Sequence, residues 1–218
     1  MPDDNPIRIL VWSDYVCPFC YLERPVLERI QAELGDEVEI DWRSFELRPE
    51  PEPTLDPNAE YLHRVWSQSV YPMAEARGLS LKLPPVQPRS RRAHEAAEFA
   101  RGAGLLDAMN RALFKAFFEE GRDLADLDVL LDIGRSVDLE ADDLREALAS
   151  GRYTQQVLED QQLARQIGIS GVPALIVTAG AQAYLVSGAQ SYETVMSVIA
   201  QARRESTSGK SSRLSSAE

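Results

Sequence analysis

A run of strand-forming residues is followed closely by two cysteines and a helical pattern, and this succession constrains the fold more than any other feature of the sequence. Residues 7–12 (IRILVW) are apolar and rich in β-branched side chains, which is typical of a buried strand. Apolar residues then recur at helical spacing from Pro18 to Gly35, where a helix would end. Residues 38–47 alternate apolar and charged side chains, as strands do. The chain therefore opens with a β-α-β unit in which Cys17 lies at the N-terminus of the helix.

The next hundred residues are mostly helical in pattern. Several prolines between residues 49 and 57 interrupt regular structure and mark a boundary. A first helix should follow, with Asn58 as its cap and Pro72 ending or kinking it. Further helices are predicted over residues 90–101, 105–120, 127–136, 142–150 and 154–167. Glycines at or near the helix ends are expected to form left-handed caps: Gly102, Gly104, Gly121 and Gly151.

A strand-containing segment ends the chain. Two strands are predicted over residues 174–178 and 183–186, joined by a turn that contains Gly180. A helix over residues 191–204 should complete the fold. Residues 205–218 are rich in serine and have no periodic apolar residues, so we expect a disordered tail there.

Composition narrows the function classes. The chain has 218 residues, a formal net charge of −12 and two cysteines. So few cysteines exclude a disulfide-stapled secreted protein and a four-cysteine zinc module. The negative charge argues against nucleic-acid binding, which depends on clustered lysine and arginine. No apolar run approaches the roughly 20 residues that span a bilayer, so we expect no membrane association.

The N-terminal residues carry neither the basic stretch nor the apolar core of a secretory signal, so we expect a cytoplasmic protein. Thiols are kept reduced in the cytoplasm, which favours a catalytic, redox-sensing or metal-binding role for a cysteine pair. The question of function therefore centres on Cys17-Pro-Phe-Cys20.

The position of Cys17 at a helix N-terminus predicts a reactive thiol. Unpaired backbone N–H groups and the helix dipole stabilise an anion there, so we expect Cys17 to be a nucleophilic thiolate at neutral pH. Cys20, one turn further on, can reach the Cys17 sulfur and resolve a mixed disulfide formed with a substrate. The pair can then cycle between dithiol and disulfide, so no cofactor is predicted.

Three other interpretations of the pair compete with catalysis. A zinc site needs two more ligands, and the histidines, His63 and His94, lie far off in the helical region, so no metal is predicted. A structural disulfide across four residues would stabilise the fold little and would be reduced in the cytosol. The two thiols could also be inert core residues, as buried cysteines often are.

A second signal lies at residues 170–173 (SGVP), directly before a predicted strand. Pro173 cannot donate a hydrogen bond to a sheet, and a proline in a tight loop is a candidate for the cis isomer. An ordinary trans turn is an equally good interpretation of this loop by itself.

Taken together, the motifs carry a family resemblance over about residues 7–204. The segments SDYVCPFCYL, RRAHEAAEFA, ALFKAFFEEGRDLADLDVLLDI and GISGVPALIV…VSGAQ resemble the FrnE-like branch of DsbA-like oxidoreductases, which includes 2-hydroxychromene-2-carboxylate isomerases. The resemblance implies an α/β, thioredoxin-like fold built from residues 1–48 and 152–204. It also implies an all-helical domain inserted at residues 49–151.

The resemblance further implies a functional site. The Val172–Pro173 bond would be cis and would pack against the cysteine pair, and the Val172 backbone would pair with an extended substrate chain. The catalytic residues would be Cys17 and Cys20. The substrate-binding residues would be Val172, Pro173, Phe19 and Pro18.

We therefore expect a thiol–disulfide oxidoreductase or disulfide isomerase, a protein disulfide oxidoreductase of the DsbA family. Its partners would be thiol or disulfide proteins or glutathione, which is a candidate co-substrate. Phe19 stands where periplasmic relatives often carry histidine, so we predict a less oxidising cysteine couple. Related isomerases typically carry serine at the position of Cys17, and the cysteine here favours disulfide exchange.

Two alternatives belong to other function classes. The first is a glutathione-dependent isomerase or transferase of a small aromatic substrate, with the helical domain forming the roof of the cleft. The second is a non-catalytic redox-sensing module whose partner surface is the helical domain.

Several other polar residues are candidates for roles at the site. Asp14 could accept a proton through water, but a turn or cap role is favoured. His94 lies on an alanine-rich helix face, which favours packing or a satisfied hydrogen bond over catalysis. Arg89, Arg91 and Arg92 form a basic cluster that could bind the carboxylates of glutathione, although a solvated helix start is the favoured interpretation.

Overall fold

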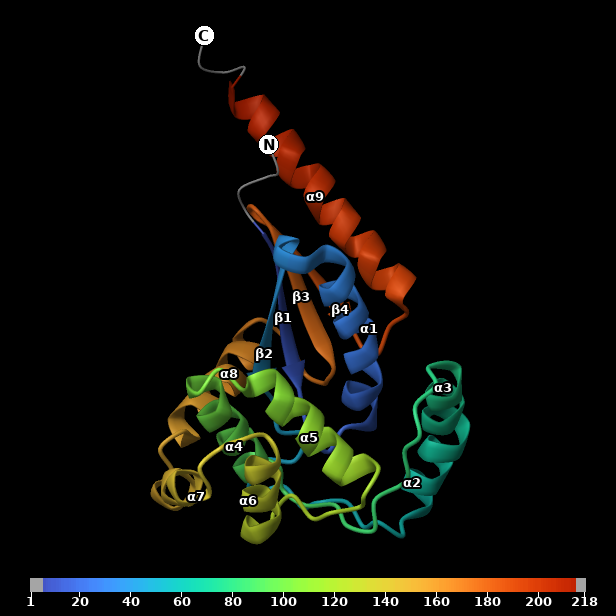
Figure 1. The fold of residues 1–218 in the computed structure, drawn as a ribbon. Coiled ribbons are helices and arrows are strands. Elements are labelled where there is room, and N and C mark those ends of the chain that lie inside the picture. The colour runs from blue at the N-terminus through green and yellow to red at the C-terminus, as the bar shows by residue number, and fades with distance from the viewer. Residues whose placement is uncertain (1–5, 215–218) are drawn as a thin grey trace.

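The computed structural model describes residues 6–214, with side chains to residue 206 (Figure 1). The strands are β1 (Ile7–Ser13), β2 (Val38–Ser44), β3 (Ala174–Ala179) and β4 (Gln182–Ser187). The α-helices are α1 (Pro18–Leu34), α2 (Glu60–Val65), α3 (Tyr71–Ala76), α4 (Arg91–Gly102), α5 (Leu106–Phe118), α6 (Leu127–Ser136), α7 (Ala141–Ser150), α8 (Thr154–Gln166) and α9 (Tyr192–Leu214). This order confirms the predicted β-α-β unit, the helical region and the final α-β-β-α segment.

The four strands form one sheet in the order β2-β1-β3-β4. β1 runs parallel to β2 and antiparallel to β3, which pairs antiparallel with β4. Alternate residues of β1 point to the same face, and Ile9 and Val11 pack there in a core with Ile30 of α1 and Ile199 of α9. Figure 1 shows α1 and α9 together on this side of the sheet.

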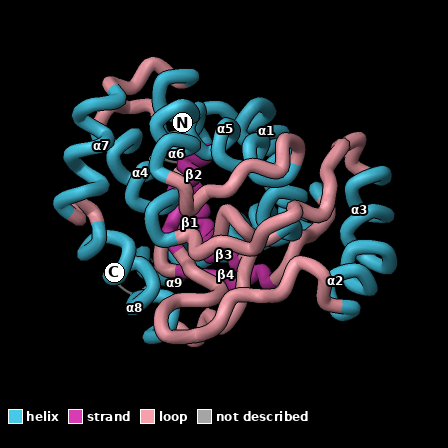
Figure 2. Tube along the Cα trace, turned by 90° about the horizontal axis from the view of Figure 1, so that it is seen from below, coloured by secondary structure: helices cyan, strands magenta, loops and turns pink. Residues whose placement is uncertain are grey.

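The helical region has its own core, which continues into the β-α-β unit. Phe114 and Phe117 of α5 are fully buried and belong to the same apolar cluster as Tyr21 and Leu22 of α1. Figure 1 places α4 to α7 beyond the C-terminal end of β1, where the cysteine loop begins. In Figure 2, α2 and α3 lie apart from these helices, with loops between the two groups.

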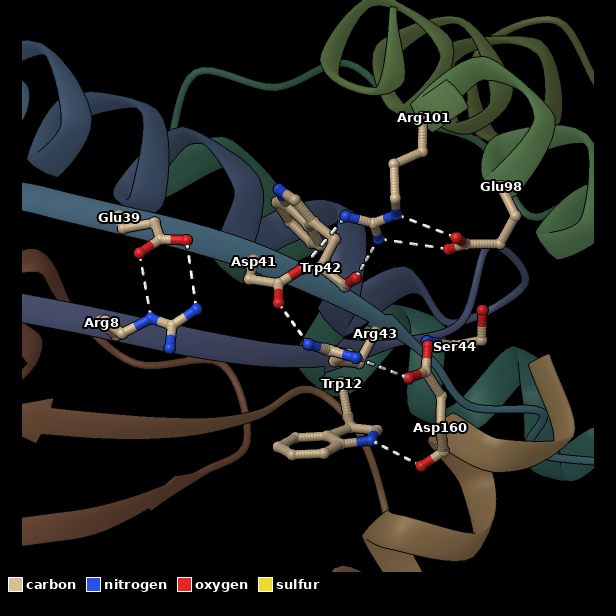
Figure 3. Close-up of polar contacts among 10 residues, drawn as sticks. All are labelled: Arg8, Trp12, Glu39, Asp41, Trp42, Arg43, Ser44, Glu98, Arg101 and Asp160. Atoms are coloured by element: carbon tan, nitrogen blue, oxygen red, sulfur yellow. Dashed lines mark hydrogen bonds and ion pairs between the residues drawn. The ribbon is translucent and has the colours of Figure 1, made fainter. Parts of the chain in front are cut away.

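Charged side chains join the sheet to the surrounding helices. Arg43 of β2 donates to Asp160 Oδ1 of α8 at 3.0 Å, and the Trp12 indole donates to the Asp160 carbonyl at 3.0 Å (Figure 3). Arg101 of α4 reaches Asp41 of β2 at 3.1 Å. These contacts bring together segments that lie about 60 to 150 positions apart in the sequence.

The first helix after the prolines differs from its prediction. Its N-cap is Ala59, so the prediction of Asn58 as the cap is wrong. The helical path does not end at Pro72, because it passes through a π-helical turn (Trp66–Val70) into α3. Pro72 lies in the first turn of α3, and a widened turn ahead of a proline accommodates its missing N–H group.

Two predictions at helix ends are also corrected. Gly102 is the last residue of α4, and the glycine with a positive φ is Gly104 (φ +73°). α9 continues to Leu214, so the predicted disordered tail from residue 205 is wrong as far as residue 214, and residues 215–218 lie outside the described residues. Glu205 accepts hydrogen bonds from Gln201 on the same helix and from Tyr184 of β4. The second contact comes from the neighbouring hairpin, which helical periodicity does not reveal.

Candidate active site

The start of α1 positions Cys17. Cys17 is the N-cap residue, Pro18 lies in the first turn, and the Cys17 carbonyl accepts the backbone N–H of Cys20 at 3.1 Å. The Cys17 side chain caps no backbone N–H of the helix. Its thiol instead donates to the Val172 carbonyl at 3.5 Å. The first turn of α1 directs its unpaired backbone N–H groups toward this end of the helix, where Cys17 lies.

Cys20 lies one turn further along α1 and is only 1% exposed. The backbone N–H of Asp14 donates to the Cys20 sulfur at 3.5 Å. Burial is the main cause that raises the pKa of the Cys20 thiol well above its ordinary value, and Cys17 adds to the rise. The Asp14 N–H and the Ser13 hydroxyl lower the pKa of this thiol, without cancelling the effect of burial. Both cysteines are free thiols, and both are buried.

The loop before β3 brings Val172 and Pro173 to the cysteines. The Val172–Pro173 peptide bond is cis, as the resemblance implies. The Pro173 carbonyl accepts the N–H of Gly188 at 2.8 Å, which ties the loop to the end of β4. The Val172 carbonyl is thereby held beside the thiol of Cys17.

A pocket of about 280 Å³ opens beside Cys17. Four predicted site residues line it: Cys17, Pro18, Phe19 and Val172. Its other walls are mainly apolar and include Leu47, Leu55, Leu62, Trp66 and Phe118. Pro173 lines a separate depression, and Cys20 lines neither. Of the two cysteines, Cys17 is therefore the one that a substrate in the pocket can meet.

The cation that faces this pocket is Arg48, which sequence reasoning missed. The predicted basic cluster lies elsewhere: Arg91 pairs with buried Glu46 at 2.5 Å, and Arg89 donates to the Arg48 carbonyl at 3.0 Å. Arg92 is exposed and does not line the pocket. Arg48 follows β2 in a stretch without periodicity, so the sequence offers no signal for its placement.

Asp14 and His94 meet in the interior although 80 positions separate them in the sequence. The Asp14 carboxylate accepts the N–H of Val16 at 3.3 Å and that of Leu47 at 2.7 Å, which confirms the predicted turn role. His94 packs on the Tyr15 ring, with centroids 4.8 Å apart, which confirms the predicted packing role. His94 Nε2 lies 3.4 Å from Asp14 Oδ1 but makes no hydrogen bond, so the expected satisfied bond is not found at that atom.

Neither a metal cluster nor a membrane span occurs among the described residues. No cluster of three or more histidine, cysteine, aspartate or glutamate side chains in this part of the chain could hold a metal ion. No helix among the same residues has the length and apolar character needed to cross a membrane.

Comparison with known proteins gives one curated relative and several structural neighbours. The uncharacterised protein YwbO of Bacillus subtilis (strain 168) is 35% identical over 177 residues, which are 78% of this chain and 86% of YwbO. The crystal structure of the probable DsbA oxidoreductase SCO1869 from Streptomyces coelicolor is 26% identical and covers 91% of both chains with a TM-score of 0.79.

Two further structures share the fold at lower identity. A 2-hydroxychromene-2-carboxylate isomerase is 16% identical, with a TM-score of 0.75 over 92% of this chain and 98% of the isomerase. The cytosolic disulfide reductase DsbM from Pseudomonas aeruginosa is 19% identical, with a TM-score of 0.66 over 83% of this chain and 89% of DsbM. These neighbours have the DsbA-like thioredoxin fold with its helical region, which the α/β arrangement described above shares.

A family model agrees with the structural neighbours. The model of the DSBA-like thioredoxin domain matches residues 8–200, which run from β1 into α9 and include the cysteine pair and the loop before β3. The protein therefore belongs to the DSBA-like thioredoxin domain family.

Proposed function

We propose that this protein is a thiol–disulfide oxidoreductase or disulfide isomerase in which Cys17 attacks the substrate and Cys20 resolves the intermediate. The observation that carries the proposal is the different placement of the two thiols. Both thiols are buried, but Cys17 lies at a helix N-terminus and lines the pocket, whereas Cys20 lies one turn further along α1 and does not line it. The similarity to the probable DsbA oxidoreductase supports the same chemistry.

The reaction needs only the two sulfurs and the substrate. The Cys17 thiolate attacks one sulfur of a substrate disulfide, forms a mixed disulfide and releases the first substrate thiol. Cys20 then attacks the Cys17 sulfur, which releases the second substrate thiol and leaves the cysteine pair oxidised. The chain has no third cysteine, so an external thiol, such as glutathione, must reduce the pair again.

The surroundings of Cys17 favour a broad range of substrates. We assign the Val172 backbone, beside Cys17, to pairing with an extended substrate chain, and Phe19 and Pro18 to the flanking contacts. Main-chain pairing gives affinity without sequence specificity. We place the reaction in the cytoplasm, the compartment named for the DsbM neighbour.

Insulin reduction and the refolding of scrambled ribonuclease test this proposal. Cys17→Ser removes the nucleophile and should abolish turnover in both assays. Cys20→Ser removes the resolving thiol and should accumulate a covalent mixed disulfide, visible on a non-reducing gel. Ser150→Ala is a control, because the Ser150 hydroxyl bonds only within α7. Unchanged turnover in both cysteine variants would contradict the mechanism.

A glutathione-dependent isomerase of a small aromatic substrate is the second candidate. Trp66 and Phe118 line the pocket together with the cation of Arg48, and this combination favours a ligand with an aromatic part and a carboxylate. The fold shared with the 2-hydroxychromene-2-carboxylate isomerase supports this candidate. Glutathione binding without dithiol turnover would favour the isomerase over the oxidoreductase.

A further inference from the structure

A second depression, with a volume of about 310 Å³, adjoins the loop before β3. Its wall consists of residues 168–174 and, from β4 and the position after it, of Leu185, Ser187 and Gly188. Val172 lines both this depression and the pocket beside Cys17, so the two meet at that residue. The disulfide chemistry proposed above assigns nothing to the depression.

The depression differs in charge from most of the protein surface. None of the described residues that line it is charged, although 27% of the chain is charged and the net charge is −12. Its larger side chains, such as Ile169 and Leu185, are apolar. A carboxylate or ammonium group would lose water here without meeting an opposite charge. The depression therefore fits an uncharged, apolar group, in contrast to the pocket beside Cys17 with its Arg48.

Leu185 is the exposed apolar side chain of this surface, with 52% of its area open to solvent. Its neighbour Val186 packs in the core with α1 and α9, so Leu185 points to the opposite face of the sheet. There it lies beside its β3 partner Ile176, which is half-buried against the cluster around Trp12. An apolar segment lying over Leu185 would remove this surface from water, which is favourable.

The backbone of β4 is also placed to bind an extended chain, because β4 is an edge strand of the described sheet. The Gly188 N–H donates to the Pro173 carbonyl at 2.8 Å, on the β3 side. Backbone groups of an antiparallel pair turn alternately toward the partner strand and away from it, so Leu185, three positions before Gly188, turns its N–H and carbonyl outward. Outward backbone groups at a sheet edge can pair with the main chain of another segment. Leu185 thus offers side-chain and main-chain contacts to one extended segment.

We propose that an extended, apolar segment of a protein substrate docks along Leu185 in this depression while the substrate disulfide lies at Cys17. The inference rests on the proposed disulfide chemistry and narrows the substrate class to polypeptides with an accessible apolar stretch, as unfolded chains have. A substrate chain that pairs with the Val172 backbone would continue into the depression, because Val172 lines both sites. A small disulfide that occupies only the pocket beside Cys17 would not reach Leu185.

Reduction of insulin and of hydroxyethyl disulfide, each measured as kcat/KM, tests this surface. Insulin is a polypeptide, whereas hydroxyethyl disulfide is too small to span both sites. Leu185→Asp places a charge where the apolar segment would lie, so it should lower kcat/KM for insulin about tenfold through a higher KM. The value for hydroxyethyl disulfide should stay at the wild-type level. Leu185→Met keeps an apolar side chain and should retain the wild-type value for insulin.

Leu158→Asp is the matched control, because it adds the same charge at another exposed leucine. Leu158 is 37% exposed in α8 and lines neither the pocket nor the depression, so its replacement should change kcat/KM for neither substrate. An unchanged value for insulin in Leu185→Asp, or an equal loss for both substrates, would overturn the inference.

A ligand without reactive thiols separates this inference from the proposed function. Reduced and carbamidomethylated α-lactalbumin is an unfolded chain with blocked thiols, so its binding requires no disulfide chemistry. In fluorescence anisotropy the wild type should bind it, and Leu185→Asp should raise the Kd about tenfold. A Kd that Leu185→Asp leaves unchanged would overturn the docking surface. A wild-type protein that binds this ligand but reduces neither disulfide would instead contradict the proposed function.

A second copy of this chain is the other occupant that an open sheet edge invites. Sedimentation velocity of the wild type and of Leu185→Asp distinguishes the two occupants. A monomer in both cases supports a substrate segment at Leu185. A wild-type dimer that dissociates in Leu185→Asp would show that the edge is covered by a second copy, and would overturn the inference.

Discussion

Arg48 shows how a single side chain sets the charge of the pocket beside Cys17. Its guanidinium lies 3.9 Å from Glu52, and both side chains are about half exposed. Exposed ion pairs at this distance contribute little, so the Arg48 charge is available to a ligand. A carboxylate on a substrate in the pocket would meet this cation.

We predict that Arg48→Gln raises the KM for glutathione disulfide about tenfold, because a charge-assisted contact of roughly 1.4 kcal/mol is lost. The KM for the uncharged hydroxyethyl disulfide should stay unchanged. Arg92→Gln is the control, since Arg92 does not line the pocket. Steady-state kinetics with both disulfides check the prediction, and equal changes for the two substrates would count against it.

At the scale of elements, a buried ion pair ties α1, α3 and α9 together. Glu23 of α1 is 1% exposed, and its carboxylate accepts the N–H of Gln190 at 2.8 Å, just before α9. Arg77, just after α3, lies 3.5 Å from Glu23 and donates to the carbonyls of Leu22 and Gln190. Burial outweighs these two partners and raises the pKa of Glu23 to about 7.

This raised pKa predicts the direction of a pH effect on stability. The folded state holds the Glu23 proton more tightly than the unfolded state, whose pKa is about 4.5. The contribution to stability is therefore fully present below about pH 4.5 and is lost as the pH rises through about 7. The loss should be on the order of 3 kcal/mol.

Urea unfolding of wild type and Glu23→Gln at pH 5 and pH 8 checks this effect. The glutamine of the variant cannot titrate, so only the wild type should lose stability from this site between pH 5 and pH 8. The unfolding free energy of Glu23→Gln, relative to wild type, should therefore be higher at pH 8 than at pH 5. A difference that is constant between the two pH values would show that Glu23 titrates normally.

At the scale of the whole molecule, the helical region shares an apolar core with the start of α1 and the loop before it, while the sheet packs with α1 and α9 in a second core. Tyr15, Cys20 and Tyr21 of the β-α-β unit belong to the same buried cluster as Phe114 and Phe117 of α5. The ion pair between Asp41 and Arg101 adds a polar contact across the same junction (Figure 3). The division into two domains, residues 1–48 with 152–204 and residues 49–151, stays a prediction. Because the two parts share a buried cluster, their unfolding should be coupled.

We predict that the two parts unfold in a single transition, because separate unfolding would expose the shared cluster. Trp12 reports on the sheet and Trp66 on the helical region, and both are buried. Two variants are needed, one with Trp12 and the other with Trp66 as its single tryptophan. Urea unfolding of the two variants should give coincident fluorescence midpoints. A lower midpoint for the Trp66 reporter would show that the helical region unfolds first.

The local features of the fold could be predicted from the sequence because their signals are local. The strand before the cysteines, the helix with Cys17 at its start and the later strand pair follow from periodicity and from caps that lie within a few residues. Two helical features depend on more than neighbouring residues. The helical path continues through Pro72 because a π-helical turn precedes it, and α9 continues past residue 204, where Glu205 contacts Tyr184 of β4. Helical periodicity alone therefore placed the end of α9 too early.

The sequence by itself determined where the two thiols lie: Cys17 at a helix N-terminus and Cys20 one turn later, with a proline loop expected to face them. Only the tertiary structure decided what surrounds these thiols. Arg48 faces the pocket, Arg91 pairs with Glu46, and His94 reaches Asp14. These placements result from packing between segments distant in the chain, and neither residue type nor local spacing encodes which buried side chains will meet.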